Sequence, residues 1–368
     1  MKVLIAGGYG FGNLGDEAIL SVLLKKLNRM NASARILSFS PRETYAMHKS
    51  ESIGYGRPLR TMHEIMTTDV LLIGGGGVFD TRIAGRTRRA MAWLYILLGY
   101  LAILTGRKIW LESISILTPD PITCSLLYPI LKKADRISAR DDQSQKILSK
   151  MSARAVNIVG DLTLQLKPAD SRLVEQHLAS LGAGVNRFTI GLALRSTGDP
   201  STDQKISHLV DELASWAYQY SAQIVLIAFS HHRLSRHEND VEFLSRLRDK
   251  VKKKQVVTIF AKQVHPSILE AMIGRIDFLV GMRLQSLIMA HNMHVPMLAI
   301  AYHPKITLFA NAIGAETLLP HELNEAAIKS IIDYANSCKC ALNARNPSGQ
   351  DCWPRFFQTN YSKAPRQD

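Results

Sequence analysis

Short apolar runs alternate with amphipathic stretches along most of the chain. Apolar runs of about four to eight residues predict buried strands, and apolar residues recurring every three or four positions predict helices. The predicted strands are Val3–Ala6, Arg35–Ser38, Val70–Ile73, Lys108–Leu111, Arg136–Ala139 and Val156–Val159, then Thr189–Leu194, Ile224–Phe229, Val256–Phe260, Phe278–Val280 and Met297–Ile300. The predicted helices include Glu17–Asn28, Gln143–Lys150, Ile206–Tyr218, Asp240–Val251, Ser267–Ile273 and Leu284–Met293.

This alternation is typical of α/β folds with parallel sheets covered by helices on both faces. A polar stretch near Pro168–Asn186 separates two such sets. We therefore predict two doubly wound domains, residues 1–170 and 185–335, facing a cleft where ligands bind at the carboxyl ends of strands. Residues 336–368 lack apolar periodicity and predict a basic, aromatic tail that is flexible or packs back on the body.

The composition is that of a globular protein and excludes wholesale disorder, since 46% of residues are hydrophobic and 21% charged. The formal charge of +14 suits an anionic partner, although solubility alone would also explain it. Four cysteines form neither a disulfide framework nor a zinc motif, which favours a reducing, cytoplasmic compartment. The first residues, MKVLIAGGYG, predict a strand and not a signal peptide.

The stretch Met91–Leu104 is almost entirely apolar. It is shorter than the roughly 20 residues that span a bilayer, so we predict a buried helix. The alternative is a peripheral contact with anionic lipid or a lipid-linked acceptor, because no acid lies between Asp80 and Glu112 and basic residues flank the stretch. These are Arg82, Arg86, Arg88, Arg89, Arg107 and Lys108.

Glycine-rich turns come directly after two of the predicted strands. The first strand leads into Gly7–Gly15 and then Asp16 and Glu17, and the third leads into Gly74–Gly77. Such turns let a ligand approach the backbone, and the helix that begins after the turn offers free N–H groups. The acidic pair fits a dinucleotide fingerprint poorly and also serves to stabilise a helix N-terminus. A small-molecule or sugar site is the leading interpretation, with close helix-on-strand packing as the alternative.

Cationic residues lie at strand ends of the second set. Arg195 comes directly after one strand, Arg283 precedes a helix, and Lys305 lies in a Tyr-His-Pro-Lys segment that also opens a helix. Arginine at a helix N-terminus binds carboxylate or phosphate well. Ordinary surface charge is the alternative for each residue taken alone.

Histidines and acids near residue 235 are weaker candidates. His231, His232, His237, Glu238 and Asp240 come after a predicted strand and could line the cleft, but they lack the spacing of a metal site, and no metal is predicted. Motifs of serine hydrolases, zinc proteases and P-loop proteins are absent from the sequence. The basic residues are not interleaved with aromatic ones, so no nucleic-acid partner is predicted.

Taken in order, these motifs resemble the polysaccharide pyruvyl transferase family over about residues 1–315. The resemblance rests on Gly12-Asn13-Leu14-Gly15-Asp16-Glu17-Ala18, Gly74–Gly77, Ala139-Arg140-Asp141 with Ser144, Gly281-Met282-Arg283-Leu284, and Tyr302 with Pro304-Lys305. It implies a GT-B-like fold of two Rossmann-like domains. It also implies a transferase of exopolysaccharide biosynthesis at the cell envelope, moving a pyruvyl group from phosphoenolpyruvate to a sugar hydroxyl pair of a glycan or its lipid-linked precursor. The product is a pyruvate ketal.

The resemblance also implies roles for particular residues. Phosphoenolpyruvate is a co-substrate, and no cofactor is implied. The donor-binding residues are Arg195, Arg283, Leu284 and Lys305; the acceptor-binding residues are Gly12, Asn13, Gly75, Gly76 and Gly77; and the catalytic positions are Gln285, His303 and Asp16.

Three positions depart from the family pattern. Gln285 stands where the family has a histidine, the expected acid, and glutamine cannot transfer a proton. His303 replaces an aspartate, and Glu112-Ser113-Ile114-Ser115 replaces a glycine-rich turn. The chain is then a natural variant with another acid such as His303, an altered His→Gln protein, or a relative with a changed donor or no catalysis. A nucleotide-sugar glycosyltransferase and a degenerate glycan- or membrane-binding protein stay open. The expected location is cytoplasmic, with peripheral contact at the inner face of the membrane as an extension.

Overall fold

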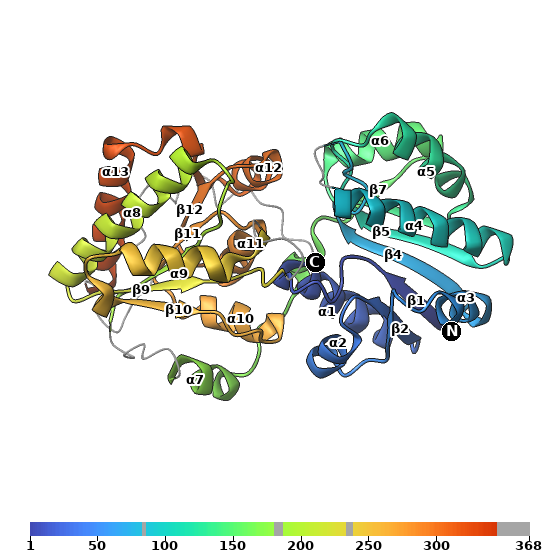
Figure 1. Ribbon diagram of the computed structural model, residues 1–368, viewed down its shortest axis with the longest axis horizontal. Coiled ribbons are helices and arrows are strands. Elements are labelled where there is room, and N and C mark those ends of the chain that lie inside the picture. The colour runs from blue at the N-terminus through green and yellow to red at the C-terminus, as the bar shows by residue number, and fades with distance from the viewer. Residues whose placement is uncertain (83–85, 180–186, 233–237, 344–368) are drawn as a thin grey trace. The chain divides into compact units, whose positions relative to one another are not determined.

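Two parallel β-sheets, one in each half of the chain, form the framework of the protein (Figure 1). The structure is a computed structural model that describes residues 1–82, 86–179, 187–232 and 238–343. The chain divides after Leu166 into two units, Met1–Leu166 and Lys167–Asp368. We refer to these as the first and second domains.

The first domain contains a seven-stranded sheet in the order β3-β2-β1-β4-β5-β6-β7. Chain order reverses between β1 and β4, which makes the carboxyl ends of these two strands the topological switch point. The strands are β1 Lys2–Ala6, β2 Ser33–Ser38, β3 Ser52–Gly54, β4 Val70–Gly76, β5 Lys108–Ile114, β6 Arg136–Ala139 and β7 Asn157–Ile158. The helices are α1 Leu14–Arg29, α2 Pro41–His48, α3 Pro58–Thr67, α4 Arg86–Leu104, α5 Pro121–Lys133 and α6 Asp142–Ser152.

The second domain repeats this topology with six strands in the order β10-β9-β8-β11-β12-β13. Its switch point lies between β8 and β11. The strands are β8 Thr189–Ala193, β9 Gln223–Ile227, β10 Val257–Phe260, β11 Phe278–Gly281, β12 Met297–Ile300 and β13 Glu316–Leu318. The helices are α7 Ser171–Ala179, α8 Pro200–Gln219, α9 Asp240–Lys250, α10 Pro266–Ile273, α11 Leu284–Asn292, α12 Pro304–Ile313 and α13 Glu325–Asn343.

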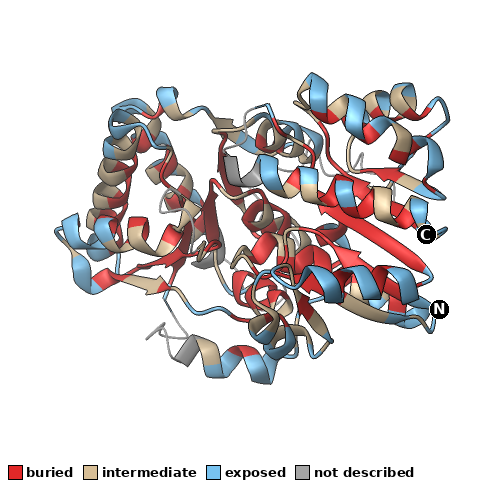
Figure 2. Ribbon diagram, turned by 45° about the vertical axis from the view of Figure 1, so that its right-hand side comes forward, coloured by how far each residue is buried: buried red, intermediate tan, exposed pale blue. Residues whose placement is uncertain are grey.

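Most residues of the central strands are buried, as Figure 2 shows. All five residues of β8 and β9 and all four of β11 and β12 are buried, which explains their continuous apolar sequence. Strand pairings within both sheets are parallel. The prediction of two parallel-sheet α/β domains is confirmed.

The predicted elements differ from the structure at the edges. The strands β3 and β13, of three residues each, were not predicted, because an outer strand that short carries too few apolar residues to form a pattern. The apolar pattern was expected to fail after Tyr334, yet α13 continues to Asn343. Ala335 and Cys338 extend its buried stripe with small side chains. The rest of the predicted tail lies outside the described residues.

Helix α4 includes the apolar stretch Met91–Leu104. Ala92, Tyr95, Ile96, Leu98 and Ala102 are buried in the core, as predicted. Its other face is exposed and is also apolar, which the prediction of a buried helix did not include. Among the residues that the structure describes, no helix has the length and hydropathy needed to span a bilayer.

Candidate functional site

The carboxyl ends of β8, β11 and β12 bring Arg195, Arg283 and Tyr302 to one edge of the second sheet. Arg195 lies two residues beyond β8, and its Nη1 donates a hydrogen bond of 3.0 Å to the Tyr302 hydroxyl. Its guanidinium carbon also lies 4.8 Å from the centroid of the Tyr302 ring. The contact orients the arginine by stacking and by hydrogen bonding. Two of the predicted site segments, far apart in sequence, therefore meet here.

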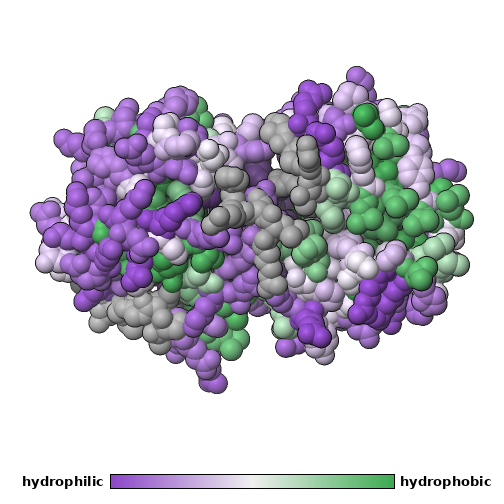
Figure 3. All heavy atoms as spheres, in the orientation of Figure 1, coloured by the Kyte–Doolittle hydropathy of each residue, from purple (hydrophilic) through white to green (hydrophobic). Residues whose placement is uncertain are grey.

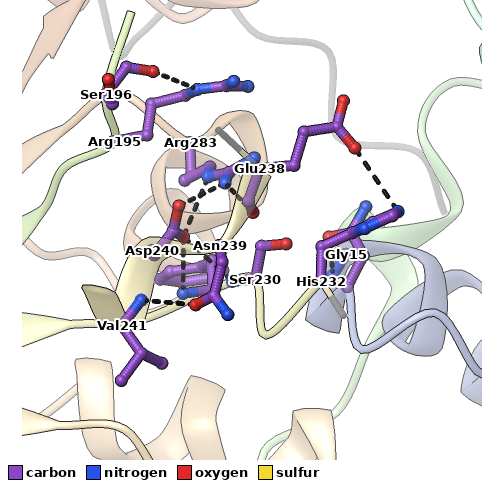
Figure 4. A network of polar contacts seen from close by, with 12 residues as sticks. Gly15, Arg195, Ser196, Ser230, His232, Glu238, Asn239, Asp240, Val241 and Arg283 are labelled. Atoms are coloured by element: carbon purple, nitrogen blue, oxygen red, sulfur yellow. Dashed lines mark hydrogen bonds and ion pairs between the residues drawn. The ribbon is translucent and has the colours of Figure 1, made fainter. Parts of the chain in front are cut away.

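Arg283 is held by Asp240, the first residue of α9 (Figure 4). Its Nε donates to Asp240 Oδ2 at 3.0 Å, its Nη2 bonds Oδ1, and Nη2 also donates to the Glu238 carbonyl at 3.3 Å. The Asp240 carboxylate further accepts the N–H groups of Phe229 and Ser230, at 3.0 and 2.9 Å. Asp240 is 1% exposed, so this is a buried ion pair that fixes the guanidinium in one orientation.

The pKa values at this edge reflect a concentration of positive charge. Burial alone would raise the pKa of the Tyr302 phenol, yet its pKa is lowered, because Lys305, Arg195 and Arg283 act on it electrostatically and Arg195 donates to its oxygen. Burial disfavours the charged form of Arg283, but Asp240 outweighs this effect and raises its pKa. The edge is therefore suited to an anion beside Tyr302.

The N-terminus of α11 adds backbone donors at the same edge. Arg283 is its N-cap residue and makes no capping bond with its own side chain among the described residues. The Ser286 N–H already donates to the Arg283 carbonyl at 2.9 Å, so the N–H groups of Leu284 and Gln285 are the donors that this helix start can offer, where the helix dipole is positive. Leu284 is only 2% exposed, so its side chain belongs to the core and only its backbone can meet a ligand. Gln285 is half-buried in this first turn.

Helix α12 begins at the end of β12, as predicted, with Pro304 in its first turn. His303 is its N-cap, and Nδ1 of the imidazole accepts the Lys305 N–H at 3.3 Å. While this bond is made, Nδ1 acts as an acceptor and is not available to donate a proton. The cap weighs against His303 as the proton donor and leaves Lys305 as the charged residue of this turn.

His232 and Glu238 form a pair close to Arg283. His232 Nε2 lies 3.5 Å from Glu238 Oε2, and the backbone carbonyl of Glu238 accepts from Arg283. Both residues were considered from the sequence but were given no role. Asp240 was also considered from the sequence, as an acidic residue at the start of a predicted helix. The structure shows that it is the partner of Arg283, 43 positions away. His237 lies outside the described residues.

The switch point of the first sheet has a different chemistry. Asn13 caps α1 by accepting the Gly15 N–H at 3.1 Å, and its amide donates to Asp16 Oδ2 at 2.7 Å. Asp16 is half-buried in the first turn of the helix. The two predicted residues are thus in direct contact at the end of β1. A carboxylate and an amide together suit the hydroxyl groups of a sugar better than an anion.

A buried contact between a carboxylate and an imidazole beside this turn was not predicted. Glu17 Oε1 accepts the Gly10 N–H at 2.7 Å, and Glu17 Oε2 lies 2.8 Å from His48 Nε2. The side chains of Glu17 and His48 are 5% and 1% exposed. Glu17 therefore fixes the backbone of the glycine turn by accepting the Gly10 N–H. The sequence pattern suggested only that it stabilises the helix N-terminus.

The glycine run at the end of β4 has two separate explanations. A Cβ on Gly75 would lie 2.1 Å from Cγ2 of Ile19, so Gly75 is needed for α1 to pack on the strand. This is the packing alternative, and the group that approaches Gly75 is a helix and not a ligand. A Cβ on Gly76 would meet no atom closer than 3.8 Å, although its φ of 80° is in the left-handed region. Gly76 is the position with room beside it.

Arg140 lies next to this turn and had no predicted role of its own. Its Nη2 is 2.8 Å from Asp161 Oδ2, with both side chains largely buried, and its Nη1 is 4.0 Å from the Cβ position of Gly76. The neighbouring Asp141 caps α6 through the Ser144 N–H at 2.8 Å. The Ala139-Arg140-Asp141 motif therefore combines one structural cap with one cation at the edge.

Neither edge contains a cluster of metal-binding side chains. Among the described residues, no group of three or more His, Cys, Asp or Glu is arranged to hold a metal ion.

Comparison with protein families adds a direct finding. The family model described as polysaccharide pyruvyl transferase matches residues 13–304, which includes Asn13, Asp16, the Gly74–Gly77 run and both arginines. No curated protein matches the chain in sequence.

Solved structures with a similar fold include proteins in complex with UDP-glucose and epimerases of UDP-GlcNAc. Anabaena Alr3699/HepE in complex with UDP-glucose is 14% identical, with a TM-score of 0.59 over 92% of this chain and 90% of that one. The UDP-GlcNAc 2-epimerase from Methanocaldococcus jannaschii is 13% identical, with a TM-score of 0.61 over 90% and 92%. A glycosyltransferase from Rickettsia africae is 15% identical, with a TM-score of 0.56 over 91% and 88%. At these identities the likeness establishes the GT-B-type fold alone.

Proposed function

Because the chain belongs to the polysaccharide pyruvyl transferase family, we propose that it transfers a pyruvyl group from phosphoenolpyruvate to a pair of sugar hydroxyls, forming a pyruvate ketal. The acceptor is a cell-surface polysaccharide or its lipid-linked precursor. The observation that carries the proposal is the meeting of Arg195, Arg283 and Tyr302 at the switch point of the second sheet.

Phosphoenolpyruvate carries a phosphate and a carboxylate on the same carbon, so its binding site needs several cations in fixed positions. Arg195 is stacked on Tyr302 and Arg283 is braced by Asp240, so neither loses much side-chain freedom on binding. Lys305 and the N–H groups at the start of α11 supply further positive charge. We assign the donor to this edge.

The reaction requires one proton to be delivered and two to be removed. Protonation of the methylene carbon gives an oxocarbenium-like centre, which the first hydroxyl attacks, and the second hydroxyl then displaces phosphate. Overall, the proton lost by one hydroxyl offsets the proton that converts the methylene carbon to the methyl group of the ketal. The proton lost by the other hydroxyl leaves on inorganic phosphate. Arginines that stabilise the departing phosphate favour the second step.

Gln285 cannot deliver the proton, so another residue must do so. We assign this role to His232, because its Nε2 lies 3.5 Å from the Glu238 carboxylate and the Glu238 carbonyl accepts from Arg283, which brings the imidazole to the donor edge. His303 is the weaker candidate, since its Nδ1 caps α12.

The acceptor is assigned to the first domain. Asp16 is the candidate base for a sugar hydroxyl, and Asn13 orients its carboxylate by a 2.7 Å hydrogen bond. A Cβ on Gly76 would meet no atom closer than 3.8 Å, and Gly12 has a left-handed backbone with a φ of 82°, so we assign these two turns to the acceptor side. Polar, uncharged recognition of this kind is suited to a sugar.

A glycosyltransferase that uses a nucleotide sugar is the second candidate. It is favoured by one observation: proteins of the same fold are solved with UDP or UDP-glucose. A diphosphate would also suit the arginines of the second domain. Position 285 is a glutamine, so the histidine that the family would use as the acid in pyruvyl transfer is not there.

Calorimetric titrations with phosphoenolpyruvate and with UDP-glucose distinguish the two candidates. We expect phosphoenolpyruvate to bind, inorganic phosphate to compete, and UDP-glucose to leave the protein unchanged. Phosphate release from phosphoenolpyruvate is then measured with glycosides that carry free 1,2- and 1,3-diol pairs. If UDP-glucose bound and phosphoenolpyruvate did not, pyruvyl transfer would be contradicted and glycosyl transfer would be favoured.

A further inference from the structure

The exposed face of α4 carries an apolar stripe in the first domain. Trp93, Leu97 and Leu104 are 43%, 54% and 81% exposed, and the half-buried Tyr100 lies between them. Residues spaced four, three and four apart lie on one side of a helix. This stripe is opposite the face that packs into the core. A single exposed leucine needs no explanation, but a continuous row of four large side chains indicates a binding surface.

Helix α5 continues this surface. Ile122 and Leu126 are 62% and 38% exposed and are one helical turn apart. Two hydrogen bonds join the helices along the exposed side: Tyr100 donates to the Leu126 carbonyl at 3.0 Å, and Trp93 donates to Thr123 Oγ1 at 3.4 Å. The stripes of α4 and α5 therefore lie side by side. We call this surface the α4–α5 face, and Figure 3 shows hydrophobic side chains gathered there.

The charge around the α4–α5 face is mainly positive. Neither helix contains an aspartate or glutamate, and the one acid at their ends among the described residues is Asp120, which caps α5 by accepting the Thr123 N–H. The ends of the helices also contain Arg89, Lys132 and Lys133, all three of them exposed. Apolar and aromatic side chains edged mainly by arginine and lysine are the composition of a surface that enters the headgroup region of an anionic bilayer.

The location of the α4–α5 face within the first domain fits this use. Helix α4 comes after β4 and α5 comes after β5, so both helices begin at the carboxyl edge of the sheet, where Gly76 and Asp16 lie. A bilayer against these helices would be beside the edge that we assign to the acceptor. A lipid-linked glycan in that bilayer would then reach the edge without leaving the membrane.

We propose that the protein docks peripherally on anionic phospholipid membranes through the α4–α5 face. The basic residues attract the surface, and the row of apolar side chains then inserts among the headgroups. The inference does not require phosphoenolpyruvate to be the donor, because docking uses neither the arginines of the second domain nor the glycine turns.

Cosedimentation of the full chain with vesicles tests the proposal, using phosphatidylcholine alone and phosphatidylcholine mixed with phosphatidylglycerol. We expect binding to the mixed vesicles, weaker binding at high salt, and little binding to phosphatidylcholine alone. The double variant Leu97→Glu with Leu126→Glu should weaken binding at least about tenfold, because two inserted side chains become charged. Lys132→Glu with Lys133→Glu should weaken it by a similar factor.

Matched controls come from the second domain. Leu173→Glu changes a leucine of α7 that is 48% exposed, and Lys250→Glu with Lys329→Glu reverses two exposed charges. Both controls should bind vesicles as the unchanged protein does. Brominated lipids should quench part of the tryptophan fluorescence, and Trp93→Phe should remove that part, whereas Trp110 and Trp216 are buried at 7% and 5% exposure.

Two results would overturn the proposal. The first is a protein that stays in the supernatant with mixed vesicles, or variants of the α4–α5 face that bind as tightly as the controls. The second is a dimer in solution that dissociates on Leu97→Glu while vesicles are not bound, because a second copy of the chain would then be the occupant of the face. Neither result bears on phosphoenolpyruvate binding, which is measured separately.

Discussion

The two domains share one topology but differ in the residues at the ends of their central strands. In the first domain, the edge at β1 and β4 carries glycine turns, Asn13 and Asp16. In the second, the edge at β8 and β11 carries Arg195 and Arg283, with Tyr302 at the neighbouring strand. The topology fixes where a ligand binds, and the side chains at the strand ends decide which ligand it is. In the proposed function, one fold unit used twice provides one edge for a neutral sugar and one for an anion.

The supports of the two edges differ as well. Glu17 and His48 hold the Gly10 turn from beneath, whereas Asp240 holds a side chain, that of Arg283. A backbone turn braced by a carboxylate keeps its shape without presenting charge. An arginine braced by a carboxylate presents its remaining donors in a fixed direction. Changes at the second edge should therefore alter anion binding, and changes at the first should not.

The largest expected effect is on turnover. His232→Gln should lower kcat by about 10²–10⁴-fold with little change in phosphoenolpyruvate affinity, because a general acid is lost and no anion contact is removed. Phosphate release with a saturating acceptor measures this. The matched change is Gln285→His in the otherwise unaltered protein. If it raised kcat by the same factor, the missing acid would belong at the start of α11, and this would contradict the role of His232.

The next effect is on stability. Asp240→Ala should lower the free energy of unfolding by about 3–5 kcal/mol, because it leaves the buried Arg283 charge without its partner. Two backbone N–H groups, those of Phe229 and Ser230, lose their acceptor as well. Urea unfolding measures the loss. Replacing Arg283 by Met at the same time should recover part of it, and a single variant as stable as the unchanged protein would show that the pair does not brace the edge.

The interiors of the domains should differ in their response to pH. Burial raises the pKa of Glu270 in α10 to about 7, while the first domain buries the phenols of Tyr9 and Tyr55, whose pKa values burial raises further above neutral. A carboxyl whose folded pKa is above its unfolded value of roughly 4.3 stabilises the fold at low pH, and this stability is lost as pH rises toward 7. The loss should be about 3 kcal/mol between about pH 5 and pH 8.

Hydrogen exchange locates this pH effect. Protection of α10 and α11 should fall with pH after correction for intrinsic exchange, and that of β1 and α1 should not. Glu270→Gln keeps a partner for Asn292 and should remove the pH dependence. An unchanged pH dependence in this variant would assign the effect to another group.

A smaller effect is expected on donor affinity. Arg195→Met should weaken phosphoenolpyruvate binding by roughly 10–100-fold, the worth of a hydrogen bond to a charged group. Calorimetric titration measures it. Asp16→Asn, at the first edge, is the control and should leave the affinity within about twofold. Equal losses in the two variants would mean that the edges do not divide the ligands as we propose.

The last comparison separates the two glycines at the end of β4 by a difference of about 1–2 kcal/mol. Gly75→Ala should cost about 2–4 kcal/mol, because its Cβ meets Ile19 and the backbone is left-handed. Gly76→Ala should cost about 1–2 kcal/mol, for the left-handed backbone alone. Thermal unfolding measures both. A reversed order would mean that the space beside Gly76 is not available to an acceptor.

The sequence predicted most of the fold because its central strands are buried on both faces. The ranges Arg136–Ala139 and Met297–Ile300 match β6 and β12 to the residue. The edge strands β3 and β13 were missed, since three residues show no periodicity. The end of α13 was missed because the buried residues there, Ala335 and Cys338, are small and do not form a recognisable apolar pattern.

The candidate site was predictable in its residue types but not in its pairings. Arg195 and Arg283 could be placed at strand ends from the sequence alone. Nothing in the sequence linked Arg283 to Asp240 or Arg195 to Tyr302, because such contacts join strands that the chain visits far apart. Gly75 was interpreted as a ligand-approach position, whereas its neighbour is Ile19, and only the packing of α1 on β4 reveals that.

A crystal structure with phosphoenolpyruvate bound tests the division of roles most directly. We predict the phosphate and carboxylate of the donor beside Arg195, Arg283 and the first turn of α11, with the methylene carbon open to His232. Donor density at the glycine turns of the first domain, or guanidinium groups that do not contact the donor, would contradict this division.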